Sequence, residues 1–132
     1  LVIETQRGHN LGRIITAGSA EPNTGVPGAV DGIVAERVLR SPAAGEFLSS
    51  CRIGDYVEKG DAVGRIGDTP VGGRIDGVLR GLIRSGTWVT SGLKIGDIDP
   101  RRDVTNCFTI SDKARAIAGS VLEAVLRTYN RS

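Results

Sequence analysis

One phrase occurs twice in the chain, and this duplication constrains the fold more than any other feature of the sequence. The first repeat covers residues 44–67 and the second covers residues 76–99, and they align without a gap at an offset of 32 residues. Glycines kept in register require the same backbone path in both repeats. The sequence therefore predicts a duplicated β unit. The identical pairs are Gly45/Gly77, Arg52/Arg84, Gly54/Gly86, Val57/Val89, Gly60/Gly92, Gly64/Gly96 and Ile66/Ile98, and the pairs kept in apolar character are Phe47/Leu79, Cys51/Ile83 and Val63/Ile95.

Each repeat divides into three short strands separated by glycine turns. A glycine-led strand comes first, a short strand centred on Val57 or Val89 follows, and the last strand ends near Ile66 or Ile98. Strands this short do not persist alone, so two repeats that pack face to face would bury a shared apolar core. The pattern predicts a mainly β domain over residues 43–99, shaped as a small flattened barrel or sandwich.

The sequence before this domain, residues 1–42, predicts short strands and a linker. Residues 1–5 and 13–16 are expected to form the strands of an N-terminal β hairpin, and residues 33–39 a further strand. Residues 17–28 are rich in Gly, Pro, Asn and Ser, which is typical of a long turn or linker.

The sequence after the domain, residues 100–132, predicts a return strand followed by the clearest helix in the chain. Residues 106–110 are the expected strand, and Ser111 or Asp112 is a suitable N-cap. From Lys113 to about Tyr129, apolar residues recur at helical spacing. This C-terminal helix either covers one side of the β domain or contacts another part of the protein, and the pattern does not choose between these partners.

Composition and charge exclude several classes of function. With 17 basic and 15 acidic residues among 132, the chain has no broad basic face for nucleic acid. No apolar run reaches membrane-spanning length. Two cysteines do not make a disulfide framework, which favours a cytoplasmic protein. The sequence contains no Met and begins like the inside of a strand, so it is expected to be a fragment that lacks an N-terminal portion.

The repeats resemble the biotinyl/lipoyl carrier domains and their wider group, the barrel-sandwich hybrids. Both carry the turn phrase G-D-x-V-x-x-G, at residues 54–60 and, with Thr87 in place of the aspartate, at residues 86–92. The resemblance implies two interlocked, quasi-symmetric halves. In carriers, a lysine at the tip of the hairpin that joins the halves receives the prosthetic group. The equivalent residues 67–73 contain no lysine, so the resemblance implies the barrel-sandwich hybrid fold without the carrier function.

Longer phrases along nearly the whole chain resemble the C-terminal region of a bacterial accessory family named for selenium-dependent molybdenum hydroxylases, or for selenium-dependent molybdenum cofactor biosynthesis. The phrases that carry the resemblance are IETQRGHNLGRII, AEPNTGVPG, AERVLRSPAAGEF, IDGVLRGLI, GLKIGDIDPR and CFTISDKARAIAGSVLEAVL.

This family resemblance implies an accessory role in the maturation or cofactor assembly of selenium-dependent molybdenum hydroxylases. The implied ligand is the molybdenum cofactor, molybdopterin. The implied partners are the hydroxylase, other cofactor-maturation proteins, and a missing N-terminal region of nucleotide-fold type in the same protein.

The loop from Arg7 to Arg13 is the most concentrated polar group in the sequence. Arg7 and Arg13 flank the only histidine, His9, which precedes Asn10, and the neighbouring glycines expose backbone N–H groups. Such a loop suits an anion, and the family resemblance points to a cofactor phosphate, a molybdate or a selenium oxyanion. The alternative is a surface hairpin with solvated arginines. A single histidine excludes a multi-histidine metal site, and no metal site is predicted.

Cys107 is the candidate reactive thiol. It lies shortly before the predicted helix, with Lys113 nearby, and a thiol near a helix N-terminus has a lowered pKa. A thiolate at this place would carry sulfur or selenium. The alternative, which is the more common role of a free cysteine, is a small buried strand residue. Cys51 aligns with the apolar Ile83 and is expected in the core.

The acidic residues Asp97, Asp99 and Asp103 do not have the spacing of a calcium-binding loop. They are interpreted as a strand end followed by a turn, in which the Asp99 side chain accepts a backbone hydrogen bond. No catalytic triad, P-loop or pair of catalytic carboxylates is visible, so no catalytic residue is predicted. The alternative to the accessory role is a non-catalytic interaction or scaffold module, whose helix packs on a partner or makes a homo-oligomer.

Overall fold

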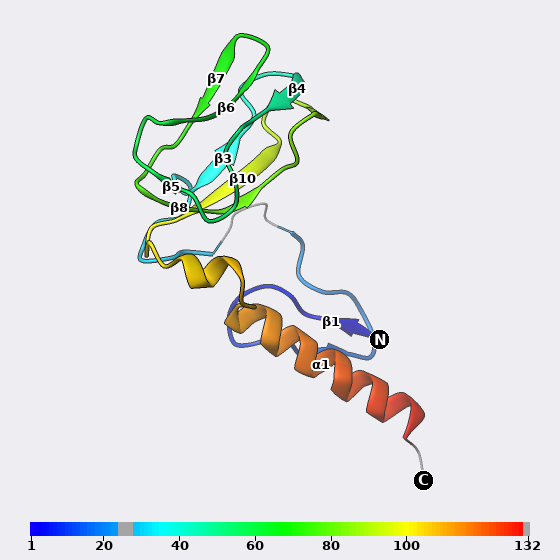
Figure 1. Ribbon diagram of the computed structural model, residues 1–132. Helices are drawn as coiled ribbons and strands as arrows, with labels where there is room; N and C mark the ends of the chain where they lie inside the picture. The colour runs from blue at the N-terminus through cyan, green and yellow to red at the C-terminus, as the bar shows by residue number, and fades with distance from the viewer. Residues whose placement is uncertain (24–27, 131–132) are drawn as a thin grey trace. The chain divides into compact units, whose positions relative to one another are not determined.

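The structure is a computed structural model that describes residues 1–23 and 28–130 (Figure 1). The chain divides into two compact units. The first unit combines the two ends of the chain, residues 1–26 and 109–132, and the second unit is the segment 27–108 between them. The duplicated sequence lies wholly in the second unit, whereas the candidate loop and the C-terminal helix lie in the first.

The second unit is built on two antiparallel sheets of four strands each. Their strand orders are β3-β10-β8-β5 and β7-β6-β4-β9. A 3-10 helix, η1 (Val104–Cys107), follows β10 and contacts β8. The strands are β3 (Val38–Arg40), β4 (Gly45–Leu48), β5 (Tyr56–Val57), β6 (Ala62–Ile66), β7 (Thr69–Gly72), β8 (Gly77–Leu82), β9 (Thr87–Val89) and β10 (Lys94–Asp99).

The two repeats interlock. When β3 is counted with the first repeat and its equivalent β7 with the second, each sheet takes two strands from each repeat. The 32-residue offset relates β3 to β7, β4 to β8, β5 to β9 and β6 to β10. In one sheet, β5 pairs with β8 and β3 pairs with β10. In the other sheet, the equivalent strands β9 and β7 pair with β4 and β6. A single repeat therefore lacks half of the strands that either sheet requires.

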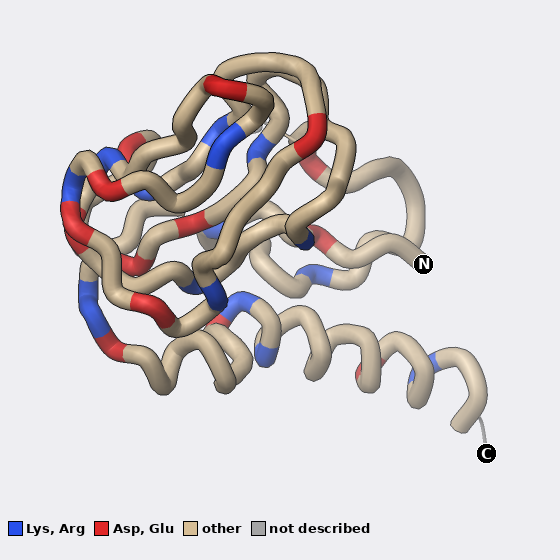
Figure 2. Tube along the Cα trace, turned by 45° about the horizontal axis from the view of Figure 1, so that its top comes forward, with Lys and Arg blue, Asp and Glu red and all other residues tan. Residues whose placement is uncertain are grey.

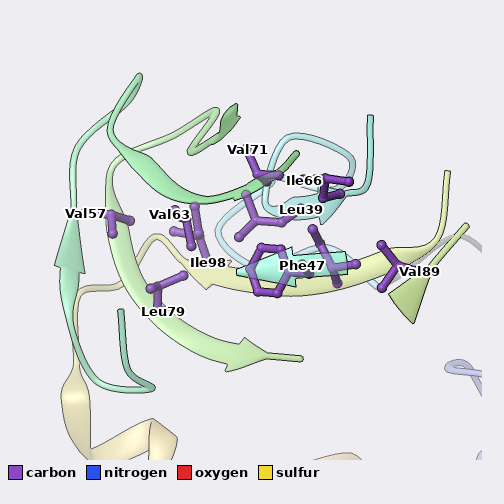
Figure 3. Close-up of a cluster of buried hydrophobic side chains, with 10 residues drawn as sticks. Leu39, Phe47, Val57, Val63, Ile66, Val71, Leu79, Val89 and Ile98 are labelled. Atoms are coloured by element: carbon purple, nitrogen blue, oxygen red, sulfur yellow. The ribbon is translucent and has the colours of Figure 1, made fainter. Parts of the chain in front are cut away.

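The hydrophobic core follows the same two-fold relation (Figure 3). Ten buried apolar side chains form its central cluster, and they are five pairs of residues separated by 32 positions. Full burial of one such side chain contributes about 1.5–3 kcal/mol, so the shared core holds the two repeats together. The pairs are Leu39/Val71, Phe47/Leu79, Val57/Val89, Val63/Ile95 and Ile66/Ile98.

The repeated glycines serve either turns or close packing. Gly54 and Gly86 have φ values of +102° and +87°, a backbone region that favours glycine. Their N–H groups donate to the carbonyl oxygens of Leu79 and Phe47, at 2.8 Å in both cases. At Gly64 the reason is space, because a Cβ atom there would lie 2.5 Å from the Phe47 ring. The register of glycines thus reflects one backbone path used twice, as predicted.

The first unit consists of a short antiparallel hairpin and one helix. Ser111 is the N-cap of the helix, and its hydroxyl accepts a hydrogen bond from the N–H of Ala114 at 3.2 Å. The hairpin and the helix meet at Gly12, where an added Cβ atom would lie 2.6 Å from the Ser120 hydroxyl oxygen. The elements are β1 (Val2–Ile3), β2 (Ile14–Ile15) and α1 (Asp112–Tyr129).

The predicted mainly β architecture, the N-terminal hairpin and the C-terminal helix are confirmed. The predicted return strand over residues 106–110 is wrong, because this stretch begins in the 3-10 helix η1. Asp103 caps η1 by accepting hydrogen bonds from the backbone N–H and the hydroxyl of Thr105, at 2.9 and 2.6 Å. A side chain that accepts a hydrogen bond from the backbone just after it stabilises a local turn, and this turn takes the place of hydrogen bonds to a neighbouring strand.

The strand predicted over residues 33–39 is shorter than expected and begins only at Val38. Ile33 instead makes an isolated bridge with Val30. Of the predicted linker over residues 17–28, residues 24–27 lie outside the described residues. None of the helices formed by the described residues is long and apolar enough to cross a membrane.

Candidate functional site

The predicted anion loop is tied to the start of α1 by its first arginine. Arg7 makes two hydrogen bonds to the Asp112 carboxylate, Nη1 to Oδ2 at 2.7 Å and Nη2 to Oδ1 at 3.1 Å. This pairing holds the pKa of Asp112 well below its usual range and raises the pKa of Arg7. Two of the guanidinium donors that would bind an anion are therefore directed at a side chain of the same unit.

The remaining loop residues make local contacts. Arg13 Nη1 donates to Asn10 Oδ1 at 3.4 Å, and the Arg13 N–H donates to the Asn10 carbonyl at 2.9 Å. His9 is exposed. The structure brings Asn10 and Arg13 together and directs Arg7 to the helix, an arrangement that matches a surface hairpin. Anion binding by this loop stays a prediction.

Glu4, which sequence reasoning missed, is the buried acid of the first unit. It is 4% exposed, and its carboxylate accepts hydrogen bonds from the N–H groups of Gln6 at 2.7 Å and Glu21 at 2.8 Å. These bonds lower the pKa of Glu4, the bond from Glu21 having the largest effect. The carboxylate thus attaches Glu21, within the predicted linker, to the residue that follows β1. A single glutamate after three apolar residues carries no sequence signal for this role.

Cys107 lies in η1, five residues before α1 begins in the sequence, and not in the strand predicted over residues 106–110. Its thiol is half-buried, and Sγ lies 3.6 Å from the Leu79 carbonyl oxygen. Burial raises the pKa of Cys107, with nearby Arg80 opposing the change. The predicted lowering of this pKa is therefore wrong in direction, because desolvation disfavours the thiolate. Cys51 packs partly buried against the core, as predicted.

The Asp99 carboxylate is fully buried and holds the turn that follows β10. The N–H of Arg101 donates to Oδ1 at 3.1 Å, which confirms the predicted bond from side chain to backbone. The Arg101 guanidinium adds bonds at 2.9 and 2.6 Å, and Arg80 Nη1 lies 3.3 Å from Oδ2. The side-chain bonds from Arg101 are the main cause of a lowered pKa at Asp99.

A second buried ion pair joins Arg37 to Asp97 on β10. Nη1 of Arg37 lies 2.6 and 2.7 Å from the two carboxylate oxygens, and the buried Nε has no hydrogen-bond partner among the described residues. Basic and acidic residues interleave along the chain (Figure 2). The described residues contain no group of three or more His, Cys, Asp and Glu side chains placed to hold a metal ion.

The clearest exposed apolar surface among the described residues is one side of α1. Large apolar side chains on this side are exposed to solvent, whereas the small side chain of Ala124 is buried. Spacings of three and four residues place the exposed side chains on one stripe. They are Val121 (47% exposed), Leu122 (60%), Val125 (47%), Leu126 (49%) and Tyr129 (82%).

No protein-family model matches the chain. Among curated proteins, the chain is similar to one described as uncharacterized protein YqeB, from Escherichia coli (strain K12), with 49% identity over 125 residues. The match covers 95% of this chain and 23% of that protein. The chain thus spans about a quarter of the length of this relative.

Two solved structures resemble about half of the chain. One is an aspartoacylase family protein from Mesorhizobium loti, with a TM-score of 0.43 and 24% identity, covering 48% of this chain and 23% of that chain. The other is a succinylglutamate desuccinylase/aspartoacylase from Rhodobacter sphaeroides, with a TM-score of 0.41 and 23% identity, covering 48% and 22%. Likenesses this weak support no argument about function.

These comparisons correct the family resemblance drawn from the sequence. No family model matches the chain, and the curated relative is described as uncharacterized. Nothing in them points to selenium or to molybdenum hydroxylases, so the predicted membership of that accessory family is wrong. The physical reason lies in the phrases themselves. Several consist of the glycines and apolar residues that the duplicated fold requires, and a fold alone does not fix a function.

Proposed function

We propose that this chain is a non-catalytic interaction module of a longer protein. In this proposal, a rigid β unit of barrel-sandwich hybrid type is joined to helix α1, and the helix docks on another part of the same polypeptide. The exposed apolar stripe of α1 carries the proposal. The ion pairs of Arg7, Asp97 and Asp99 also support it. These charged side chains bind partners within the fold, so they are not available to bind or transform a substrate.

The interlocked repeats support the barrel-sandwich hybrid assignment. Each sheet contains strands from both repeats, and the ten core residues are five symmetry-related pairs. The turn between β6 and β7 holds Gly67 and Asp68, and Arg65 donates to the Gly67 carbonyl at 2.9 Å. No lysine is available in this turn for a prosthetic group. The proposed role of the β unit is therefore that of a scaffold.

The apolar stripe of α1 is the proposed docking surface. Full burial of an exposed Leu or Val contributes about 1.5–3 kcal/mol, and these side chains are already about half buried, so each would contribute about half of that on docking. A contiguous row of exposed apolar residues marks an interaction surface. The proposed occupant is the remainder of a longer polypeptide. The E. coli relative supports this choice, since the matched region is 23% of its length and the rest of that protein lies outside the match.

The test uses the E. coli relative with its matched segment deleted. This shortened protein is mixed with the 132-residue chain, and the mixture is separated by size. We expect the two to elute together. The substitution Val125→Glu should weaken the complex at least 100-fold, because an unpaired carboxylate would be buried in an apolar contact. The relative's own matched segment, added back as a separate chain, is the positive control.

The matched control places the same new charge on the other side of the helix. Ala116 is exposed and lies nine residues before Val125, which is half a turn around the helix axis. Ala116→Glu should leave the complex intact, while circular dichroism shows that both variants keep their helix. The proposal fails if the relative's own segment binds and this chain does not, or if the two substitutions act equally.

An accessory role for molybdenum hydroxylases is not carried forward, because it rested on the family resemblance that the comparisons correct. A cytoplasmic location remains part of the proposal. It is supported by the two cysteines, Cys51 and Cys107, which are both free.

A further inference from the structure

The two-fold symmetry of the second unit is broken on the outer faces of its sheets. On sheet β3-β10-β8-β5, two outward side chains, Val38 and Val78, are 4% and 0% exposed. Their equivalents on sheet β7-β6-β4-β9 are Pro70 and Glu46, which are both exposed. The outer faces of the two sheets thus have the same backbone arrangement but differ in how far they are covered.

Segments that flank the repeats cover the first of these faces. Arg37 pairs with Asp97 there, and η1 contacts β8. At the position of Asp97, the other sheet carries Arg65, which is exposed. Among the described residues of the second unit, no flanking segment makes an equivalent ion pair with Arg65. We call the outer side of sheet β7-β6-β4-β9 the open face.

Cross-strand pairs order the side chains of the open face. Arg65 is opposite Pro70 on one side and opposite Leu48 on the other, and Glu46 is opposite Trp88. Trp88 is the only tryptophan of the chain and is 73% exposed at the sheet edge. Beside this row lies a groove of about 610 Å³, lined by Leu48, Ser49, Arg65, Asp68, Pro70 and Ser85 among others.

We infer that the open face is the interface of a symmetric homodimer, in which Trp88 of each molecule enters the groove of the other. In this dimer, the open faces of two molecules pack against each other, and the two-fold axis lies between them near Leu48. The axis reverses the strand order of one face relative to the other. Arg65 then faces Glu46 of the partner subunit. Trp88 crosses to the groove beside Arg65 and Pro70 of the partner subunit. Every contact occurs twice, as an isologous interface requires.

The chemistry of the face suits this arrangement. Trp and Arg are enriched where protein interfaces carry most of their binding energy, and an arginine beside an indole face adds a cation–π contact. The opposite charges of Glu46 and Arg65 make the face complementary to itself and not to a uniformly charged partner. Four strands of at most five residues cover roughly 15 by 17 Å, which buries less than about 1,000 Å² in total. The dimer is therefore weak and forms at micromolar concentrations or above.

The experiment is sedimentation of the full 132-residue chain over concentrations from about 1 μM to 1 mM. The average mass should rise from the 13.8 kDa of one chain towards twice that value. Tryptophan emission should shift to shorter wavelength over the same range, because Trp88 leaves water. Trp88→Ala should weaken association at least tenfold. The matched control is Tyr56→Ala, which removes the exposed aromatic at the equivalent position of the other sheet and should leave association unchanged.

A charge exchange tests the two-fold geometry itself. Glu46→Arg and Arg65→Glu should each weaken association, and the double variant should restore it to within about threefold of the unchanged chain. The inference is overturned if the chain remains monomeric at 1 mM, or if Trp88→Ala has no effect. It is also overturned if Val125→Glu abolishes association that Trp88→Ala leaves intact, since self-association would then use the helix. Because these measurements need no second protein, their failure is distinct from failure of the proposed docking of α1.

Discussion

The Asp99 carboxylate shows what a buried charge does in this chain. It is 1% exposed, and it accepts hydrogen bonds from the backbone and the guanidinium of Arg101, with Arg80 close by. A buried carboxylate with donors on both oxygens is stable in its charged form. The buried Glu4 carboxylate is stabilised in the same way, because it accepts hydrogen bonds from two backbone N–H groups. At the scale of residues, the acids that resemble site residues are structural.

Replacement of Asp99 by asparagine should destabilise the second unit by about 1–3 kcal/mol at pH 7, because Arg101 loses its charged acceptor while remaining partly exposed to water. The folded pKa of Asp99 lies below its usual value, so the carboxylate contributes stability above the unfolded pKa of about 3.9. That contribution is lost as pH falls through the folded pKa. The difference between the unchanged chain and Asp99→Asn should therefore shrink between pH 5 and pH 2.

Urea unfolding followed by tryptophan fluorescence at each pH measures this difference. Asp68→Asn is the control, since Asp68 is exposed and should give a difference near zero throughout. A gap between the unchanged chain and Asp99→Asn that stays constant down to pH 2 would show that the ion pair does not contribute to stability.

At the scale of elements, strands β6 and β10 each contain a glycine in the middle of a sheet. Gly64 and Gly96 lie where the side chains of Phe47 and Leu39 cross the strand, and an added Cβ would sit 2.5 and 2.8 Å from them. Space rather than backbone angle selects glycine here. The sequence showed that these glycines repeat, but only the structure shows that the large residues of the core cross above them.

Gly64→Ala should cost about 1–3 kcal/mol, because the Phe47 ring must move within a filled core. Gly81→Ala is the matched control in a strand of the other sheet. Its Cβ atom would meet only ordinary contacts, with Asp97 at 3.6 Å, so the cost should be below about 1 kcal/mol. Thermal unfolding of the two variants decides the matter. Equal shifts would mean that Gly64 is retained for a reason other than packing.

Much of this element structure was predictable because its signals are local. Strands β4 to β10 each begin at a glycine or within two residues after one, and the helix follows Ser111 with regular apolar spacing. The failures are non-local or depend on one side chain. Asp103 turns a predicted strand into η1, and Arg7 finds Asp112 across 105 residues. No spacing in the sequence links Arg7 to Asp112, so the ion pair that engages the candidate loop could not be predicted.

At the scale of the whole molecule, the core is a set of paired positions and not a set of independent ones. Phe47 and Leu79 are the pair that differs most in shape, since two of the other pairs are identical and the remaining two differ only in the size of an aliphatic side chain. Exchange of the two side chains keeps their summed volume. We expect Phe47→Leu and Leu79→Phe each to destabilise, and the double variant to lose at least about 1 kcal/mol less than the sum.

A double-mutant cycle with urea unfolding provides this measurement, and Val57→Ala combined with Val89→Ala is the comparison. Truncation at both positions removes volume twice, so those losses should add or exceed addition. Strict additivity for the Phe47 and Leu79 exchange would show that the two halves of the core pack independently.

Interlocking has a consequence for how such a chain is made. During synthesis, β4 and β6 leave the ribosome well before β9, which is a pairing partner of β4. Strand β3 likewise cannot pair until its partner β10, which ends at Asp99, has been made. Contacts that join distant parts of a sequence form late, and exposed edges invite wrong pairing in the interval. The nascent first repeat therefore emerges with no complete sheet to join. We expect its apolar strands to depend on chaperones, or on fast completion of the chain, until the second repeat arrives and closes both sheets together.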